Sequence, residues 1–428
     1  MKIIKILIFF FNLYKMKKNF KKIPKKFLKK TGIIRSKNTK RNYSVLENEI
    51  DDSNNVSIPK PIKLRNPGID LGRILSMYAI IVHHILHHGK AMNKYYQYKE
   101  LRNLNLATYW HINNFIFISG YIGYKTTKYS NLFYYWLCIV FYTISIKKYF
   151  SKFKPHLFNR QIEFNDFFPV INYHYWYFTS YFGMYLFLPV INTGLESINK
   201  SKLKIAVLSF IIVFIVMKDY INPSFDPFQL NKGYSVLWLL IFYITGAYFG
   251  KFNKNNNVIK KVIKIIIYIL IFYFSTYLCI KLPNYPINYY SNKQRIKNKI
   301  KIFLNSIFIM RVNSFAMILQ SLSIMLFLTV INHNKYIAKI ITFIGPLTFG
   351  IFLIHENNMI RTIMISNIFE NYSSQLPLNT IIKIILLRAL KIFGICLIIE
   401  YLRNILFRIL QIRKILIFIE KLIFKLFG

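Results

Sequence analysis

The sequence predicts an all-α, polytopic membrane protein whose transmembrane helices, about ten in number, form one bundle. Hydrophobic residues make up 54% of the 428-residue chain, aromatic residues 18% and charged residues only 17%. The 40 Phe and 32 Tyr are more than a soluble domain of this length can bury. The apolar residues gather in blocks of about twenty, which is the length that crosses a bilayer. These observations exclude an ordinary soluble enzyme, a coiled coil and a disordered chain.

The first 66 residues differ from the rest and are predicted to be a basic N-terminal extension followed by a polar linker. The apolar run from Ile3 to Leu13 is too short to span a membrane, and a lysine-rich stretch follows it. Because no small-residue cleavage site of a signal peptide is evident, the run fits an interfacial helix or an organelle-targeting extension. Residues 47–61 have too little apolar content to fold and are predicted to be the linker.

The transmembrane domain is predicted over residues 67–402. Its candidate spans are apolar blocks near residues 71–89, 104–123, 131–149, 175–193, 203–220, 235–250, 259–280, 313–332, 337–356 and 380–402. The last of them is unusual because it contains Lys383, Arg388 and Lys391. Residues 403–428 are both basic and apolar, and they predict an amphipathic helix on the membrane surface rather than a further crossing.

The chain carries 59 Lys and Arg against 15 Asp and Glu, a net charge of +44. In a soluble protein this balance would indicate nucleic-acid binding. Here the basic residues flank the apolar blocks, where they reach anionic lipid headgroups, so we expect membrane lipid and no nucleic acid as a partner. The positive-inside rule and an even number of spans place both termini in the cytoplasm, although the basic segment 281–301 then falls outside.

The first span carries the groups best suited to chemistry, because ionisable side chains at membrane depth are costly. His84 follows Arg73 by eleven residues, which is about three helical turns or about 16 Å, so both lie on one face. His88 lies on that face again, whereas His83 and His87 form a neighbouring row. A cation and an imidazole together suit a site that binds an anionic cosubstrate and moves a proton. For His87 and His88, interfacial placement at the helix end is an equal alternative.

A metal site is the rival interpretation of these histidines. Two His-x-x-x-His pairs overlap here, and this spacing can hold zinc. No Cys, Asp or Glu lies near the histidines in this span, so we predict no metal. The cysteines, Cys138, Cys279 and Cys396, lie in separate apolar blocks and imply no disulfide.

Polar groups at other span ends are further candidates. Asn113 and Ser119 lie at membrane depth in the second span, and Lys125 and Lys128 follow it; helix packing and headgroup binding are the alternatives. Trp176 belongs to an aromatic cluster that fits either an interfacial belt or a sugar-stacking surface.

In the ninth span the adjacent His355 and Glu356 could orient a reacting hydroxyl, although interfacial placement alone would also explain this pair. A base next to a carboxylate is an arrangement that general acid–base catalysis uses.

Taken in order, these stretches resemble the acyltransferase-3 family of membrane-bound O-acyltransferases. Its first span has Arg or Lys, ten residues and then His, which Arg73 and His84 match, and its variant with a later His and Gly matches His88 and Gly89. Other matching stretches are Asn113 with Ser119-Gly120-Tyr121, residues 176–192, residues 234–250 and residues 348–355, and the resemblance extends from about residue 68 to 402.

The resemblance implies transfer of an acyl group, usually acetyl from acetyl-CoA, to a hydroxyl of a carbohydrate or a similar acceptor. His84 would deprotonate the acceptor hydroxyl or an intermediate nucleophile, and Arg73 would hold a CoA phosphate or the developing oxyanion in a polar cleft open to the cytoplasm. His355 would position the acceptor with Glu356. Further acceptor contacts are expected from His88, Asn113, Ser119 and Trp176.

The chain departs from the family after the second span, where many members carry Arg-x-x-Arg. Lys125 and Lys128 occupy these positions, and lysine is a poorer bidentate phosphate ligand, so an acyl-CoA contact there is an open expectation. Two alternatives to an enzyme are a transporter or flippase for a glycan or lipid-linked substrate, with His and Arg as a proton relay, and a sensing module that has lost catalysis.

Overall fold

The structure, a computed structural model, describes residues 65–125, 127–156, 162–172, 174–222, 225–252, 258–281, 303–304, 306–308 and 310–427. All regular elements in these ranges are helices, which confirms the predicted all-α class. Residues from Asn66 onward form one compact unit. The predicted N-terminal extension and linker lie outside the described residues, apart from Arg65 and Asn66, and most of the basic segment 281–301 does so too.

The described α-helices are α4 (Pro67–His87), α5 (Ala91–Lys94), α6 (Lys99–Leu106), α7 (His111–Gly123), α8 (Tyr129–Phe153), α9 (Trp176–Ser197), α10 (Lys200–Ile211), α11 (Lys218–Ile221), α12 (Val236–Phe252), α13 (Val258–Lys281), α15 (Phe315–Val330), α16 (Lys335–Ile344), α17 (Thr348–Glu356), α18 (Asn358–Met364), α19 (Leu378–Ile409) and α20 (Ile412–Phe427). Short 3₁₀ turns are η1 (Phe164–Phe167), η3 (Asn231–Gly233), η4 (Gly345–Leu347) and η5 (Ile368–Asn371). A π-helical segment, η2 (Ile212–Met217), joins α10 to α11.

Each predicted span coincides with helix, but only three described helical stretches are long and apolar enough to cross a membrane by themselves. These are Pro67–His87, Ile259–Lys281 and Lys335–Glu356, the last made of α16, η4 and α17. Val236–Phe252 and Phe315–Val330 are apolar but shorter. The number of crossings, about ten, therefore stays a prediction.

Two predicted ranges differ from the observed helices. The second range, 104–123, is interrupted between α6 and α7, where the Thr108 hydroxyl donates to Asn105 O (2.8 Å) and the Trp110 indole donates to Ala107 O (2.7 Å). Such local side-chain bonds compete with the helical pattern and end α6. The tenth range continues to Ile409, seven residues beyond the predicted end at residue 402, because Glu400 and Arg403 near that end are paired with each other and buried.

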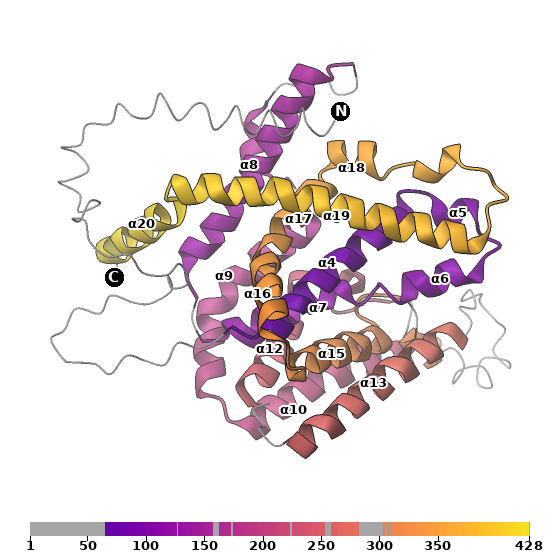
Figure 1. Cartoon of the computed structure of the whole chain (residues 1–428). Helices are drawn as coiled ribbons and strands as arrows, with labels where there is room; N and C mark the ends of the chain where they lie inside the picture. Colours follow the sequence, from indigo (N-terminus) through magenta and orange to yellow (C-terminus); the bar gives the residue numbers. More distant parts are fainter. Residues whose placement is uncertain are drawn as a thin grey trace, which may run out of the picture. The chain divides into compact units, whose positions relative to one another are not determined.

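α4 is the central helix of the bundle, since it packs against α7, α15, α16, α17 and α19. Gly68 makes one of these contacts possible: a Cβ there would lie 1.9 Å from Leu328 O of α15. Figure 1 shows α19 crossing in front of α4 and α17, and both pairs are in contact. The helix that carries Arg73 and His84 is therefore surrounded by other helices on most of its sides.

α7 and α12 pack closely along their length, and glycines set their spacing. A Cβ on Gly120 would lie 1.9 Å from Tyr243 O, and one on Gly246 or Gly250 would lie 2.2 Å from a carbonyl oxygen of α7. Gly246 and Gly250 are four residues apart, the spacing that lets two helices approach closely in membranes. Gly123, at the end of α7, has more room, since only the Tyr243 hydroxyl would lie near an added Cβ, at 3.5 Å.

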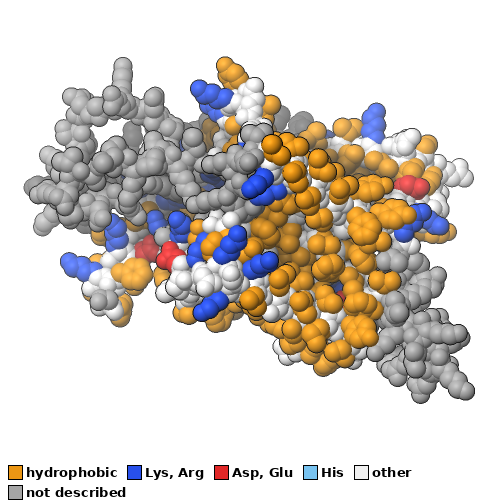
Figure 2. Space-filling view, turned by 90° about the horizontal axis from the view of Figure 1, so that it is seen from below, with side chains coloured by type: hydrophobic (Ala, Val, Ile, Leu, Met, Phe, Trp, Pro, Cys, Tyr) orange, Lys and Arg blue, Asp and Glu red, His pale blue; other side chains and the backbone are white. Residues whose placement is uncertain are grey.

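The outside of the bundle is apolar over a broad area, as Figure 2 shows for the face seen from below. α13, which lies near the bottom of Figure 1, is largely exposed and displays residues such as Ile259, Leu270, Tyr273 and Phe274. A soluble protein rarely exposes so large an apolar surface, so this face is suited to lipid tails. α20 also has no buried residue, and its exposed apolar and basic side chains match the amphipathic segment expected near the C-terminus.

We expect Gly120→Ala to lower the free energy of unfolding by about 1–3 kcal/mol, because the added methyl group must displace the α12 backbone. The matched control is Gly194→Ala in α9, where nothing lies within 4 Å of the added Cβ. Thermal unfolding of both detergent-solubilised variants measures the effect. Equal melting temperatures for the two variants would contradict the glycine-dependent packing of α7 on α12.

Candidate active site

Two helix ends bring the candidate catalytic groups together: the last turn of α4 and the last turn of α17. α4 carries His84, and α17 carries His355 and Glu356. The ring centroids of His84 and His355 are 5.3 Å apart. His355 is fully buried, whereas the His84 and Glu356 side chains keep exposed fractions of 14% and 10%. The first and ninth predicted spans thus contribute to one small, mostly closed site.

Glu356 lies beside the imidazole of His84. Its Oε2 atom is 3.1 Å from His84 Nδ1, which is an ion-pair distance, but the two groups are not aligned as a hydrogen bond. Both atoms are buried and have no other hydrogen-bond partner. A small rotation of either side chain would let His84 Nδ1–H donate to the carboxylate, and this would leave Nε2 as the basic nitrogen.

The other oxygen of Glu356 is held by Arg361, a residue that the sequence analysis did not single out. Arg361 Nη1 donates to Glu356 Oε1 at 2.8 Å. Arg361 lies in α18, and Asn357 caps that helix by accepting a hydrogen bond from Met359 N at 3.1 Å. In the sequence Arg361 is only a basic residue five positions after Glu356. Such an arginine is common near helix ends and does not by itself indicate a site. The structure makes it the counter-ion of the site.

His355 has a fixed tautomer. Its Nδ1 lies 2.7 Å from Ile351 O, and a carbonyl oxygen can only accept, so Nδ1 carries the proton. Its Nε2 is therefore an acceptor, and it is buried without a hydrogen-bond partner. An unpaired buried acceptor is costly, and in an active site it marks a position where a reacting group can bind.

A second row of histidines lies on the neighbouring face of α4, as predicted, but faces α6. His83 Nδ1 and His87 Nε2 both approach Asn105 Oδ1, at 2.8 and 3.3 Å. His111 of α7, which was not identified from sequence, adds a ring 5.5 Å from that of His83. His88 instead continues the row of His84, with ring centroids 5.4 Å apart, and is exposed.

Arg73 lies near the other end of α4, about 16 Å along the helix from His84. Its Nη1 donates to Asp70 Oδ1 at 2.5 Å, and Asp70 is fully buried. Asp70 packs against Gly345, where a Cβ would lie 2.6 Å from Oδ1. Asp70 contacts the start of the η4–α17 segment, and His84 contacts its end. Asp70 and His84 therefore lie on the side of α4 that faces this segment.

Two polar residues predicted at the site serve helix contacts in this structure. Asn113 donates from Nδ2 to Val312 O at 2.8 Å and accepts from the Trp238 indole at 3.0 Å. Ser119 donates to Phe115 O, one turn earlier in its own helix. Both side chains thus have partners in other parts of the bundle or in their own helix.

The remaining predicted contacts lie at helix ends. Trp176 begins α9 and packs edge-on against Tyr234, with ring centroids 4.5 Å apart. Lys125 and Lys128 are exposed, and Lys128 O accepts a hydrogen bond from the Tyr185 hydroxyl at 2.8 Å. None of these three side chains has a hydrogen bond or ion pair to His84, His355 or Glu356 among the contacts of the described residues.

A buried ion pair in α19 was also missed from sequence. Glu400 and Arg403 bond through both oxygens of the carboxylate, and Glu400 accepts a further bond from the Tyr142 hydroxyl at 2.6 Å. Arg403 Nη1 donates to the Tyr134 hydroxyl at 2.8 Å. Gly350 of α17 lies directly against Glu400, since a Cβ there would be 1.9 Å from Oε2. The network joins α8, α17 and α19 behind the site.

Comparison with known protein families identifies the family of this chain. The acyltransferase domain of the acyltransferase-3 family matches residues 66–400, which is most of the chain. The chain belongs to the acyltransferase-3 family. No curated protein and no solved structure matches it. The resemblance drawn from Arg73, His84 and the later motifs is therefore confirmed, and the family together with the apolar helices indicates a membrane acyltransferase.

The acyltransferase also brings together three side chains that could bind a metal ion: His84, His355 and Glu356. Their nearest ligand atoms lie within 4.8 Å of one another, and two His with one Glu is a set that zinc enzymes use. His84 Nδ1 and Glu356 Oε2 are 3.1 Å apart, close to the roughly 3.3 Å that separates two ligands of a tetrahedral zinc ion. Glu356, however, is already paired with Arg361. This ion pair favours proton transfer, and the absence of a metal stays a prediction.

We expect purified acyltransferase to carry far less than one zinc, iron or manganese ion per chain, because the carboxylate among the three potential ligands already belongs to an ion pair with Arg361. Elemental analysis by mass spectrometry after chelator-free purification measures this. The matched comparison is the His355→Ala variant. One equivalent of a metal that disappears in this variant would contradict the prediction.

Proposed function

We propose that this acyltransferase moves an acyl group, acetyl in the simplest case, from acyl-CoA to a hydroxyl of a carbohydrate or a similar acceptor. The observation that carries the proposal is the series Arg361–Glu356–His84, set beside the unpaired Nε2 of His355. A carboxylate that holds one nitrogen of an imidazole leaves the other as a general base and stabilises the imidazolium that forms. Membership of the family supports acyl transfer as the reaction.

In the proposed reaction His84 Nε2 removes the proton of the acceptor hydroxyl as its oxygen attacks the thioester carbonyl. The new ester C–O bond forms, the C–S bond breaks, and the leaving thiolate takes the proton from His84. His355 Nε2 accepts a hydrogen bond from a neighbouring hydroxyl of the acceptor and so aligns the reacting one, since its Nδ1 is committed to Ile351 O. Glu356 acts here through His84, as a positioning residue. Deprotonation of an intermediate nucleophile by His84 remains the alternative route.

The donor is proposed to enter from the Arg73 end of α4. Arg73 uses Nη1 to bind Asp70, and the rest of its planar fork can bind a phosphate oxygen of CoA. The pantetheine arm would then cover the three turns between Arg73 and His84. This arrangement needs a polar cleft on the cytoplasmic side, and it assigns Lys125 and Lys128 at most a long-range attraction for the anionic donor. Stabilisation of the oxyanion by Arg73 is disfavoured by the 16 Å separation from His84.

The acceptor is proposed to enter from the opposite end, where His88 is exposed next to His84. Trp176 lies at the start of α9, where an aromatic ring could stack on a sugar. The membrane supplies the surroundings of the bundle, and no metal takes part in the proposed steps.

His84→Ala should reduce acyl transfer by about 10²–10⁴-fold, since the general base is lost. His156→Ala, in an exposed position after α8, is the control and should retain wild-type activity. Release of free CoA thiol from acetyl-CoA by purified protein, at equal expression, measures the effect. A transporter would release no thiol with any acceptor, and full activity of His84→Ala would remove the mechanism.

Arg361→Met should lower kcat by roughly tenfold to a hundredfold, while the KM for acetyl-CoA changes little. Without its counter-ion Glu356 would no longer hold His84 in the required tautomer. Arg361→Lys keeps the charge, so it should recover part of the loss. A purely structural role would be indicated if both variants lost thermal stability and activity in parallel.

A further inference from the structure

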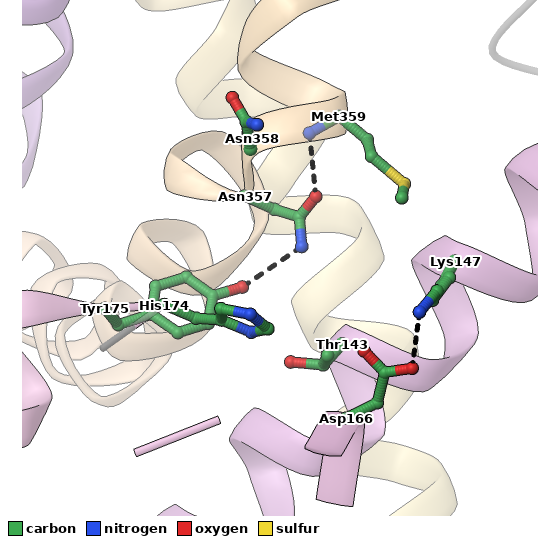
Figure 3. Close-up of a pocket in the computed structure, with 8 residues that line it drawn as sticks. All are labelled: Thr143, Lys147, Asp166, His174, Tyr175, Asn357, Asn358 and Met359. Atoms are coloured by element: carbon green, nitrogen blue, oxygen red, sulfur yellow. Dashed lines mark hydrogen bonds and ion pairs between the residues drawn. The ribbon is translucent and has the colours of Figure 1, made fainter. Parts of the chain in front are cut away.

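A pocket of about 210 Å³ lies beside the reaction residues and is not used in the steps above. It is formed where α8 ends, η1 follows, α9 begins and α17 turns into α18 (Figure 3). Buried residues, among them Thr143 and Tyr175, form its floor, whereas His174 and Asn358 are exposed at its mouth. The volume is below the roughly 300–1,000 Å³ of sites for drug-sized ligands, so it suits a group of about one ring.

The floor of the pocket is polar but electrically balanced. Lys147 Nζ is 2.6 Å from Asp166 Oδ2, and both side chains are only 8% exposed. Glu163 lies 3.8 Å from the same ammonium group but is largely exposed. Because the buried charges neutralise each other, neither an anionic nor a cationic ligand would gain a free counter-charge there.

One hydroxyl on the floor has no well-formed partner. Thr143 Oγ1 is buried and makes no hydrogen bond of good geometry, although it lies near the Tyr175 hydroxyl. In Figure 3 this oxygen points toward Tyr175 and His174, across the pocket. A buried hydroxyl can both donate and accept, so it is matched by another hydroxyl.

The pocket wall is joined directly to the reaction residues. Asn357, which lines it, follows Glu356 in the chain and donates to the Tyr175 hydroxyl at 3.3 Å. That hydroxyl donates in turn to Leu353 O at 3.0 Å, two residues before His355. A group bound in the pocket is therefore held against the end of α17 that carries both His355 and Glu356.

We propose that this pocket is the acceptor subsite of the acyltransferase and that it binds a neutral, hydroxyl-rich group of one-ring size. The inference rests on the proposed function, because it takes the acceptor hydroxyl to react at His84 and His355. Thr143 recognises one hydroxyl of the ring by a hydrogen bond, and the Lys147–Asp166 pair accepts and donates to others. The acylated hydroxyl is a different one, directed past Asn357.

The test uses full-length acyltransferase in lipid nanodiscs with acetyl-CoA and two acceptors of the same ring and tail. n-Octyl β-D-glucopyranoside is neutral, and n-octyl β-D-glucuronide is an anion at neutral pH. Mass spectrometry of the acetylated glycoside and thiol release measure transfer. We expect the glucoside to be acetylated with a KM at least tenfold below that of the glucuronide.

Thr143→Val should raise the KM for the glucoside about fivefold, the effect of one neutral hydrogen bond, with the KM for acetyl-CoA within twofold of wild type. The matched control is Thr245→Val, a buried threonine of α12 whose hydroxyl binds Ile241 O. Asn358→Trp, at the exposed mouth, should raise the same KM by filling the entrance. Because Asn358 Oδ1 lies 3.5 Å from Arg361 Nη2, kcat is measured together with KM to separate the two effects.

The inference is overturned if the glucuronide is used as well as the glucoside, if the glucoside is not acetylated while thiol is released, or if neither pocket variant changes its KM. A wild-type protein that releases no thiol under any condition would overturn the proposed function instead. The two failures are therefore distinguishable in one set of assays.

Discussion

The site depends on one constraint: ionisable side chains buried between helices must find partners, because the surroundings cannot solvate them. α4 brings the imidazole of His84 into the bundle, where it meets His355 and Glu356 at the end of α17. Glu356 is shared between His84 and Arg361, so neither its charge nor that of the arginine is left alone. The packing of α4 against its neighbouring helices holds His84 in place beside Glu356.

Two kinds of contact give the bundle the rigidity that such a site requires. Glycines let α7 and α12 approach until backbone touches backbone, which leaves little freedom for either helix to rotate. On the other side, the Glu400–Arg403 pair binds tyrosines of α8 and packs on Gly350 of α17. Gly350 lies just over one turn before His355, so this pair supports the helix that presents the catalytic histidine.

Sequence alone predicted the parts of the site that lie within one helix. The helical period places Arg73, His84 and His88 on one face, and the adjacent base and carboxylate in the ninth span pointed to His355 and Glu356. Sequence could not reveal Arg361, Asp70 or the Glu400–Arg403 pair as partners, because each looks like a common charge until its neighbour in space is known. Asn113 shows a different ambiguity, since a polar residue at membrane depth can either line a site or join helices, and here its side chain bonds to Val312 and Trp238. The number of crossings stays a prediction, because several helices are too short or too interrupted to span a membrane by themselves.

Arg361 lies in the first turn of α18, the helix that Asn357 caps. Asn357 begins that turn and forms the wall of the pocket, and the guanidinium that steadies the carboxylate comes four residues later. A ligand bound against Asn357 would therefore contact the same turn of backbone that positions Arg361 and Glu356, and through them the imidazole of His84.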